Sequence, residues 1–206
     1  MSNINNIILS CAYLPPIDYF RAIKNSKQWK VEQWENYQKQ SYRSRCHIYS
    51  ANGLLPLYIP IERDRGLSIP IREIKIDNSK EWQIHHWRAL VSAYRSSPFF
   101  DYYKDDLYIF YTNKYEYLFE YNIALLSCIL ELIGFPEHIE FTLNYKVETE
   151  LCDYRNEIHP KKVSPFVSEN KKGKYHQVFA HKHGYISNLS IVDLLFNEGP
   201  QSYDYI

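Results

Sequence analysis

The order of segments at the N-terminus constrains the fold more than any other feature. Residues 5–12, NNIILSCA, form a continuous apolar run, as in a strand that is buried on both faces. A proline turn at 13–16, a short helical segment at 17–26 and an alternating segment at 27–33 follow. Strand, turn, helix and strand in this order open a parallel α/β unit. We therefore expect an α/β fold whose sheet starts with a parallel β-α-β unit.

A β-hairpin is predicted next. Asn52-Gly53 is a strong hairpin signal, because both residues accept the positive φ angles of a type I′ turn. With these two residues in the turn, Ile48 pairs with Leu57. Prolines at 56 and 60 lack N–H groups, so the second strand of the hairpin is expected at an edge of a mixed sheet.

Helices are expected to flank this sheet. A segment at 81–97 has helical spacing, an apolar segment at 118–135 fits a buried core helix, and Ser190 and Gly199 mark the ends of a short helix. The chain has 206 residues, of which 45% are hydrophobic. A chain of this size builds one core, so we expect residues 1–206 to form a single α/β domain.

Charge and composition exclude several classes of partner. Lys plus Arg equals Asp plus Glu at 24 each, so no overall field attracts nucleic acid or an anionic membrane. The most apolar segment carries Glu120 and Glu131 and is too short to span a bilayer. The four cysteines lie far apart and form no CxxC pair, which favours free thiols. We expect a cytoplasmic protein without membrane insertion.

One stretch is the first candidate site. Residues 36–46, NYQKQSYRSRC, hold amides, hydroxyls and cations but no carboxylate. In the predicted hairpin, Arg43 and Arg45 point away from the core, and with Lys39 they could clamp a phosphate or carboxylate. Tyr37 and Gln38 suit the hydroxyl groups of a sugar. The alternative is an exposed, solvated strand face.

Further candidates lie elsewhere in the chain. His86 and His183 are candidate general bases, since histidine often fills that role. Arg88, on a cationic helix stripe, and Asn197, at the end of the last helix, are weaker candidates for substrate binding. Cys11 follows the first strand, where open α/β sheets place ligands, but a buried free thiol is the more common role.

No cofactor or metal is expected. The six glycines form no phosphate loop or dinucleotide motif, and there is no nucleophile elbow or zinc-protease helix. His176, His181 and His183 lie close in sequence, but without a carboxylate or cysteine alongside, solvated side chains are the more common outcome.

Four blocks resemble the WbqC-like family of bacterial proteins. They are YLPPIDYF at 13–20, ENYQKQSYRSRC with ANGLLPLYIPI at 35–61, WRALVSAYRSSPFFDYYKDDL at 87–107 and HGYISNLSIVDLLFNEGP at 183–200. Members of that family occur among genes for surface polysaccharides, and some are proposed glycine transferases that act on nucleotide-linked amino sugars. The resemblance carries no established catalytic residues.

The resemblance and the candidate residues together suggest an acyl or aminoacyl transferase whose small-molecule substrate is a nucleotide sugar. Two alternatives stay open: a nucleotide-sugar-binding transferase without acyl chemistry, and a non-catalytic binding or scaffold protein of the same pathway.

Overall fold

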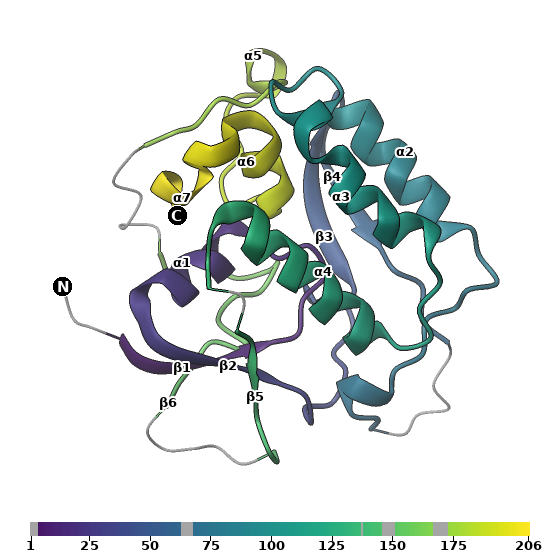
Figure 1. The fold of residues 1–206 in the computed structure, drawn as a ribbon, viewed down its shortest axis with the longest axis vertical. Coiled ribbons are helices and arrows are strands. Elements are labelled where there is room, and N and C mark those ends of the chain that lie inside the picture. The colour runs from purple at the N-terminus through teal and green to yellow at the C-terminus, as the bar shows by residue number, and fades with distance from the viewer. Residues whose placement is uncertain (1–3, 63–67, 137, 146–150, 167–172) are drawn as a thin grey trace.

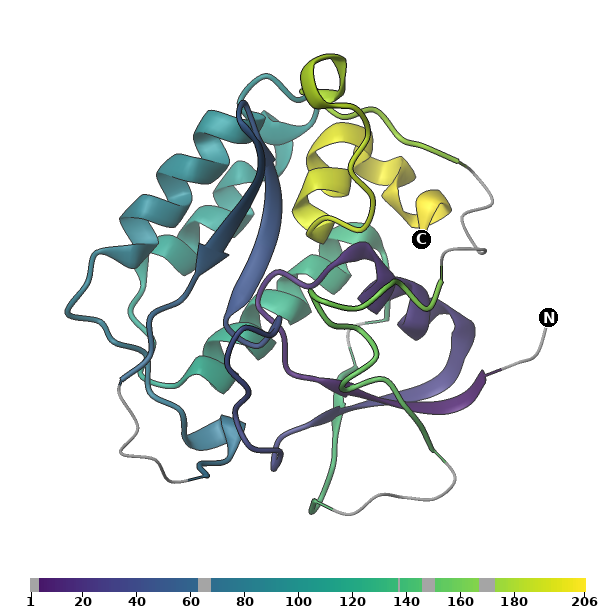
Figure 2. The same cartoon turned by 180° about the vertical axis from the view of Figure 1, so that it is seen from behind.

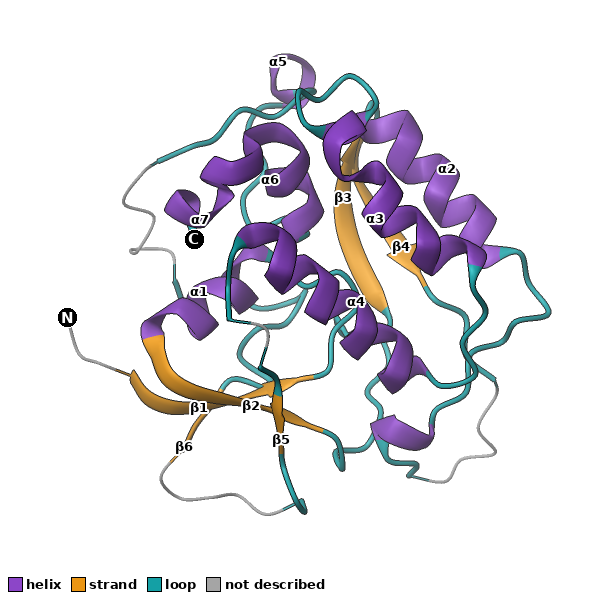
Figure 3. Cartoon of the chain, in the orientation of Figure 1, coloured by secondary structure: helices purple, strands orange, loops and turns teal. Residues whose placement is uncertain are grey.

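The computed structural model describes residues 4–62, 68–136, 138–145, 151–166 and 173–206. Its main sheet has four parallel strands in the order β5-β2-β1-β6. β1 (Ile4–Ser10) lies in the middle, between β2 (Ser26–Glu32) and β6 (Leu151–Asp153), and β5 (Glu140–Phe141) extends the sheet beyond β2. Figure 3 shows this sheet at one end of the molecule. The predicted α/β class is confirmed.

The predicted β-α-β start is confirmed as well. α1 (Ile17–Asn25) carries the chain from β1 back to the start of β2, and Ile4 pairs with Ser26. Ile7, Ile8 and Leu9 are almost fully buried, as expected for a strand covered on both faces. Numbered by their order along the chain, the strands of this sheet have the spatial order 3-2-1-4, since β5 is the third and β6 the fourth of them in the sequence. In such sheets the crevice for a ligand lies at the ends of the strands, where the order reverses.

The hairpin forms a sheet of its own, not an edge of the main sheet. β3 (Arg45–Ser50) and β4 (Gly53–Tyr58) pair in an antiparallel way with each other. Ile48 pairs with Leu55, two residues from the predicted partner Leu57. The reason is that Gly53, with φ of 97°, pairs with Ser50 and leaves residues 51 and 52 as the turn. A shift of two keeps every side chain on its predicted face.

Besides α1, the longer helices are α2 (Trp82–Tyr94), α3 (Phe100–Thr112), α4 (Leu118–Ile133) and α6 (Ile191–Glu198). Shorter turns are η1 (Ile71–Glu73), α5 (Ala180–His183), η3 (Gly199–Gln201) and α7 (Ser202–Tyr205). α2 and α3 pack beside the hairpin (Figures 1 and 2). α4 contacts the main sheet through Phe119, whose ring lies 5.7 Å from that of Phe141 in β5. The buried apolar side chains form one cluster. Within the described ranges, every helix is too short or too polar to cross a membrane.

Candidate functional site

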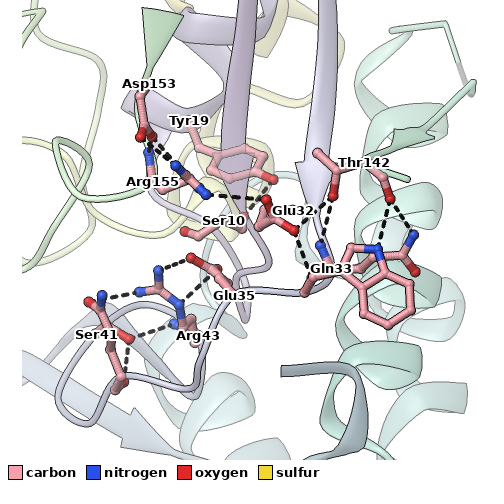
Figure 4. A network of polar contacts seen from close by, with 12 residues as sticks. Ser10, Tyr19, Glu32, Gln33, Glu35, Ser41, Arg43, Thr142, Asp153 and Arg155 are labelled. Atoms are coloured by element: carbon pink, nitrogen blue, oxygen red, sulfur yellow. Dashed lines mark hydrogen bonds and ion pairs between the residues drawn. The ribbon is translucent and has the colours of Figure 1, made fainter. Parts of the chain in front are cut away.

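Polar side chains gather where the parallel strands end. Ser10, Glu32 and Asp153 are the last residues of β1, β2 and β6, and Thr142 follows β5. We call this the carboxyl edge of the sheet, and Figure 4 shows its polar contacts. Ligands of open α/β proteins bind at this edge. A ligand site is therefore expected in the loops that leave these four strands.

Arg155 ties two of the strand ends together. Its Nη1 donates to Glu32 Oε2 at 3.2 Å, and its Nε and Nη2 donate to Asp153 at 3.0 and 2.7 Å (Figure 4). The Thr142 hydroxyl donates to the other oxygen of Glu32 at 2.8 Å. The fully buried carboxylate of Glu32 is thus paired on both oxygens, as a buried charge must be. This network fixes the ends of the strands relative to one another.

Arg43 is buried and its charge is neutralised within the protein. Its Nε and Nη2 donate to the two oxygens of Glu35 at 2.9 and 2.5 Å, and Nη1 reaches Gln38 Oε1 at 3.4 Å (Figure 4). Burial raises the pKa of Glu35, and Arg43 opposes that rise. The expectation that Arg43 points away from the core as part of the hairpin is wrong, because Arg43 precedes β3 and is buried, and the carboxylate just before the carboxylate-free stretch folds back onto it. Arg43 holds the loop in place.

Arg45 has a different environment. Its side chain is also mostly buried, yet Nη2 donates to the Gln40 carbonyl at 2.6 Å and Nη1 to the Tyr58 hydroxyl at 3.2 Å. No carboxylate in the described part of the chain pairs with it, and its buried Nε has no hydrogen-bond partner there. A buried cation without a counter-charge is costly. A bound anion would therefore stabilise Arg45 by supplying the counter-charge that the described residues lack.

Basic side chains of the loop after β6 lie near Arg45. The Lys161 ammonium donates to the Gln40 side chain at 2.5 Å, which places the loop after β6 against the loop before β3. Burial lowers the pKa of His159, and Arg43, Arg45, Lys161 and Lys162 lower it further. Those shifts indicate a positive potential around the imidazole. We call Arg45, His159 and Lys161, together with Lys39, which precedes Gln40 in the chain, the cation cluster. Sequence reasoning missed His159 and Lys161, since they lie more than 100 residues from Arg45.

The other predicted residues of the 37–45 loop lie beside this cluster. The Tyr37 hydroxyl shares a hydrogen bond with Ser44 Oγ at 2.6 Å, and its ring is half-buried. Gln38 and Lys39 are exposed. The loop therefore offers an amide and an ammonium to solvent, and the Gln40 carbonyl, next in the chain, accepts from Arg45.

His86 is enclosed in the core. Its Nδ1 lies 2.9 Å from the Tyr13 hydroxyl, and its ring packs against those of Tyr13 and Trp82 at 5.6 and 5.1 Å. Burial lowers the pKa of His86 to about 4, so the imidazole is neutral at neutral pH. These contacts account for a buried histidine without any substrate.

His183 lies near the tip of the hairpin, where its Nε2 is 2.9 Å from the Ala51 carbonyl oxygen. Arg45 starts β3, so the length of this strand, about 20 Å at 3.3 Å per residue, separates the two. Arg88 is exposed on α2. Asn197 is buried and donates to the Asp193 carbonyl at 2.7 Å, within its own helix. Among the described residues, His183, Arg88 and Asn197 make no hydrogen bond or ion pair with the cation cluster, whereas His86 is connected to Arg45 through Tyr58, whose backbone bonds to His86 and whose hydroxyl accepts from Arg45.

Cys11 lies where the sequence places it, immediately after β1. The thiol is fully buried, and burial raises its pKa to about 12, although Asn122 donates a hydrogen bond to Sγ at 3.2 Å. A thiol with so high a pKa is not a nucleophile at neutral pH. Across the described residues, no three His, Cys, Asp or Glu side chains are grouped as a metal site would need.

The fold and the site define an α/β protein of the open parallel-sheet class, with charged side chains gathered at the carboxyl edge. The model of the WbqC-like protein family matches residues 11–161, a span that contains the hairpin, the cation cluster and every strand of the main sheet except β1. The chain therefore belongs to the WbqC-like protein family, and this membership suggests a role in polysaccharide biosynthesis. The chain is also similar to the uncharacterised protein Rv1507c of Mycobacterium tuberculosis, with 25% identity over 97% of this chain and 96% of that protein. No solved structure matches it significantly.

Proposed function

We propose that this protein is a transferase that acts on a nucleotide-linked amino sugar in surface-glycan biosynthesis, and that the diphosphate of the nucleotide binds at the cation cluster. The observation that carries this proposal is the buried guanidinium of Arg45 without a carboxylate partner among the described residues. Arginine forks fit phosphate oxygens, and a bound diphosphate would supply the missing negative charge.

The surroundings of Arg45 fit the rest of such a ligand. Lys39 and Lys161 are exposed ammonium groups that can reach further phosphate oxygens. Gln38 presents an amide, which can donate to and accept from sugar hydroxyls. Since neighbouring cations lower the pKa of His159, a bound anion would raise that pKa, and the imidazolium would add a fourth positive charge to those of Lys39, Arg45 and Lys161.

The finer proposal is acyl transfer, with glycine as the group moved to the sugar amine. Family resemblance supports it, whereas the geometry around two of its predicted participants is less favourable. His86 is enclosed in the core and His183 lies near the hairpin tip. These positions favour a second candidate, a transferase that binds the nucleotide sugar without acyl chemistry.

Calorimetric titration with uridine, thymidine and guanosine diphosphate sugars tests the binding proposal. We expect at least one of them to bind, and Arg45→Gln to weaken it by about 10- to 100-fold, which corresponds to the loss of a charged hydrogen bond. Arg88→Gln is the matched control, because Arg88 is exposed on α2 and should not affect binding. Absence of binding, or equal affinity in Arg45→Gln, would refute the proposal.

Mass spectrometry separates the two candidates. The protein is incubated with the nucleotide-linked amino sugar that binds and with activated glycyl donors, namely a thioester and an aminoacyl ester. A glycylated product supports the acyl transferase. Unchanged sugar with every donor, despite tight binding, supports the alternative without acyl chemistry.

A further inference from the structure

Two helices begin side by side next to the end of β1. The chain before α1 and the chain before α6 exchange backbone hydrogen bonds, and Pro16 and Ser190 form an isolated β-bridge between them. Asp18 lies in the first turn of α1, and Ser190 is the N-cap residue of α6. The fold therefore brings an acid and a hydroxyl from opposite ends of the chain to one place at the carboxyl edge.

Both side chains are buried with an unpaired polar atom. Asp18 has no exposed surface, and Arg21 Nη1 donates to its Oδ1 at 3.0 Å. Its Oδ2 has no partner at hydrogen-bond distance among the described residues, although the Ser164 hydroxyl lies near enough to lower the pKa of Asp18 against the rise that burial causes. The Ser190 Oγ has no hydrogen-bond partner there either. An unsatisfied buried polar group costs about 1–3 kcal/mol, and more when it is charged. Native proteins keep few such groups, and a ligand is one reason to keep them.

Tyr42 connects this acid to Arg45. The pKa of Tyr42 is raised to about 12, mainly by burial and also by the charge of Asp18, while the charge of Arg45 opposes the rise. The Tyr42 backbone carbonyl accepts from Tyr13 N–H at 2.8 Å, which holds this residue against the loop that follows β1. The Tyr42 ring also packs against that of His47 at 5.8 Å, and the His47 carbonyl accepts from Ser190 N–H at 2.8 Å, so Tyr42 is linked to the segment that begins α6.

We propose that Asp18, Ser190 and Tyr42 form a subsite for the protonated amino group of the sugar, next to the diphosphate site at Arg45. This inference rests on the proposed function and assigns the part of the site that distinguishes an amino sugar from a neutral one. An ammonium group has three donors and no acceptor, so a carboxylate oxygen and two hydroxyl oxygens complement it. Binding would pair Asp18 Oδ2 and Ser190 Oγ at once.

Access to this subsite requires movement. Because Asp18 is fully enclosed, the amine reaches it only after the surrounding side chains move apart. Binding that needs such a change is slower than simple docking. We therefore expect the amino sugar to associate more slowly than the free nucleotide, although it binds more tightly.

The test compares three ligands that share one nucleotide: the amino sugar, the same sugar with a hydroxyl in place of the amine, and the free nucleoside diphosphate. We expect the wild-type protein to prefer the amino sugar over the hydroxyl sugar by about 10-fold or more, as for a charged hydrogen bond. Asp18→Asn should reduce this preference to near unity and leave the affinity for the free nucleoside diphosphate unchanged.

Asp193→Asn is the matched control, since Asp193 is another buried carboxylate in the first turn of a helix. It should keep the preference for the amino sugar. Melting curves establish that each variant folds. If Asp18→Asn does not fold, Ser190→Ala takes its place, with a smaller expected loss of preference of about three- to tenfold, as for a neutral hydrogen bond.

The outcomes separate this inference from the proposed function. Loss of the preference in Asp18→Asn alone supports the subsite. If the wild-type protein binds both sugars equally, or if Asp18→Asn keeps the preference, the subsite is refuted while nucleotide-sugar binding stands. If neither sugar nor the nucleoside diphosphate binds, the proposed function and the subsite both fail.

Discussion

The ion pair between Arg43 and Glu35 gives the sharpest prediction of stability. Glu35→Gln preserves the size of the side chain but removes its charge, so Arg43 stays buried as an unpaired cation. Arg43 is 1% exposed and Glu35 5%, so water cannot take the place of the lost partner. Breaking a buried pair in this way costs about 3–5 kcal/mol. That is a large part of the roughly 5–15 kcal/mol by which a domain is stable.

Urea unfolding measures this loss. With a slope of about 2 kcal/mol per M, the midpoint should fall by about 2 M. The double variant Glu35→Leu with Arg43→Met should lose less than Glu35→Gln alone, because it leaves no uncompensated charge in the interior. The matched control is Asp101→Asn, which breaks the exposed pair of Asp101 with Lys104 and should cost less than about 1 kcal/mol.

A loss below about 1 kcal/mol in Glu35→Gln would refute the reasoning. It would show that Arg43 finds solvent or another partner without strain. Arg43 would then be free to bind a ligand, as the sequence alone suggested, and the distinction drawn between Arg43 and Arg45 would disappear.

Three further predictions concern single residues. The ordinary pKa of histidine, 6.5, falls to about 4 in His86, so its buried neutral form stabilises the fold above pH 6.5. This contribution, about 3 kcal/mol, is lost as the pH falls from 6.5 to 4. Over that range the urea midpoint of His86→Gln should therefore change less with pH than that of the wild-type protein; an equal change in both would contradict this. Gly199→Ala places a Cβ 2.5 Å from the Phe99 ring at a φ of +55°, and should cost about 2–4 kcal/mol; an unchanged melting temperature would contradict the clash. Iodoacetamide should modify exposed Cys152 within minutes and leave buried Cys11 intact, as peptide mass mapping would show; rapid modification of Cys11 would reopen its role as a nucleophile.

Local patterns predicted the elements of the fold better than their assembly. The β-α-β start and the helix from Ser190 to Gly199 depend on neighbouring residues, and both formed as expected. The hairpin exists, but its register moved by two because Gly53 takes its positive φ inside the strand pair instead of in the turn. A dipeptide signal cannot distinguish these two arrangements, since both place a glycine at a positive φ.

The candidate site shows the same limit more strongly. The stretch at 36–46 was singled out for its lack of carboxylates, yet Glu35, one residue outside it, pairs with Arg43. Lys161 reaches Gln40 only because β6 lies next to β1 in the parallel sheet. Asp18 and Ser190 each have a local explanation as helix-start residues. Only the fold shows that the segments that carry them lie side by side and that each side chain has a buried polar atom without a partner among the described residues.

A crystal structure of the protein with a nucleotide-linked amino sugar tests the central claim most directly. We predict that the diphosphate lies against the Arg45 guanidinium and within reach of Lys161, at the carboxyl edge of the parallel sheet. A diphosphate bound elsewhere, for example beside Arg88 on α2 or near His183 at the hairpin tip, would contradict the account.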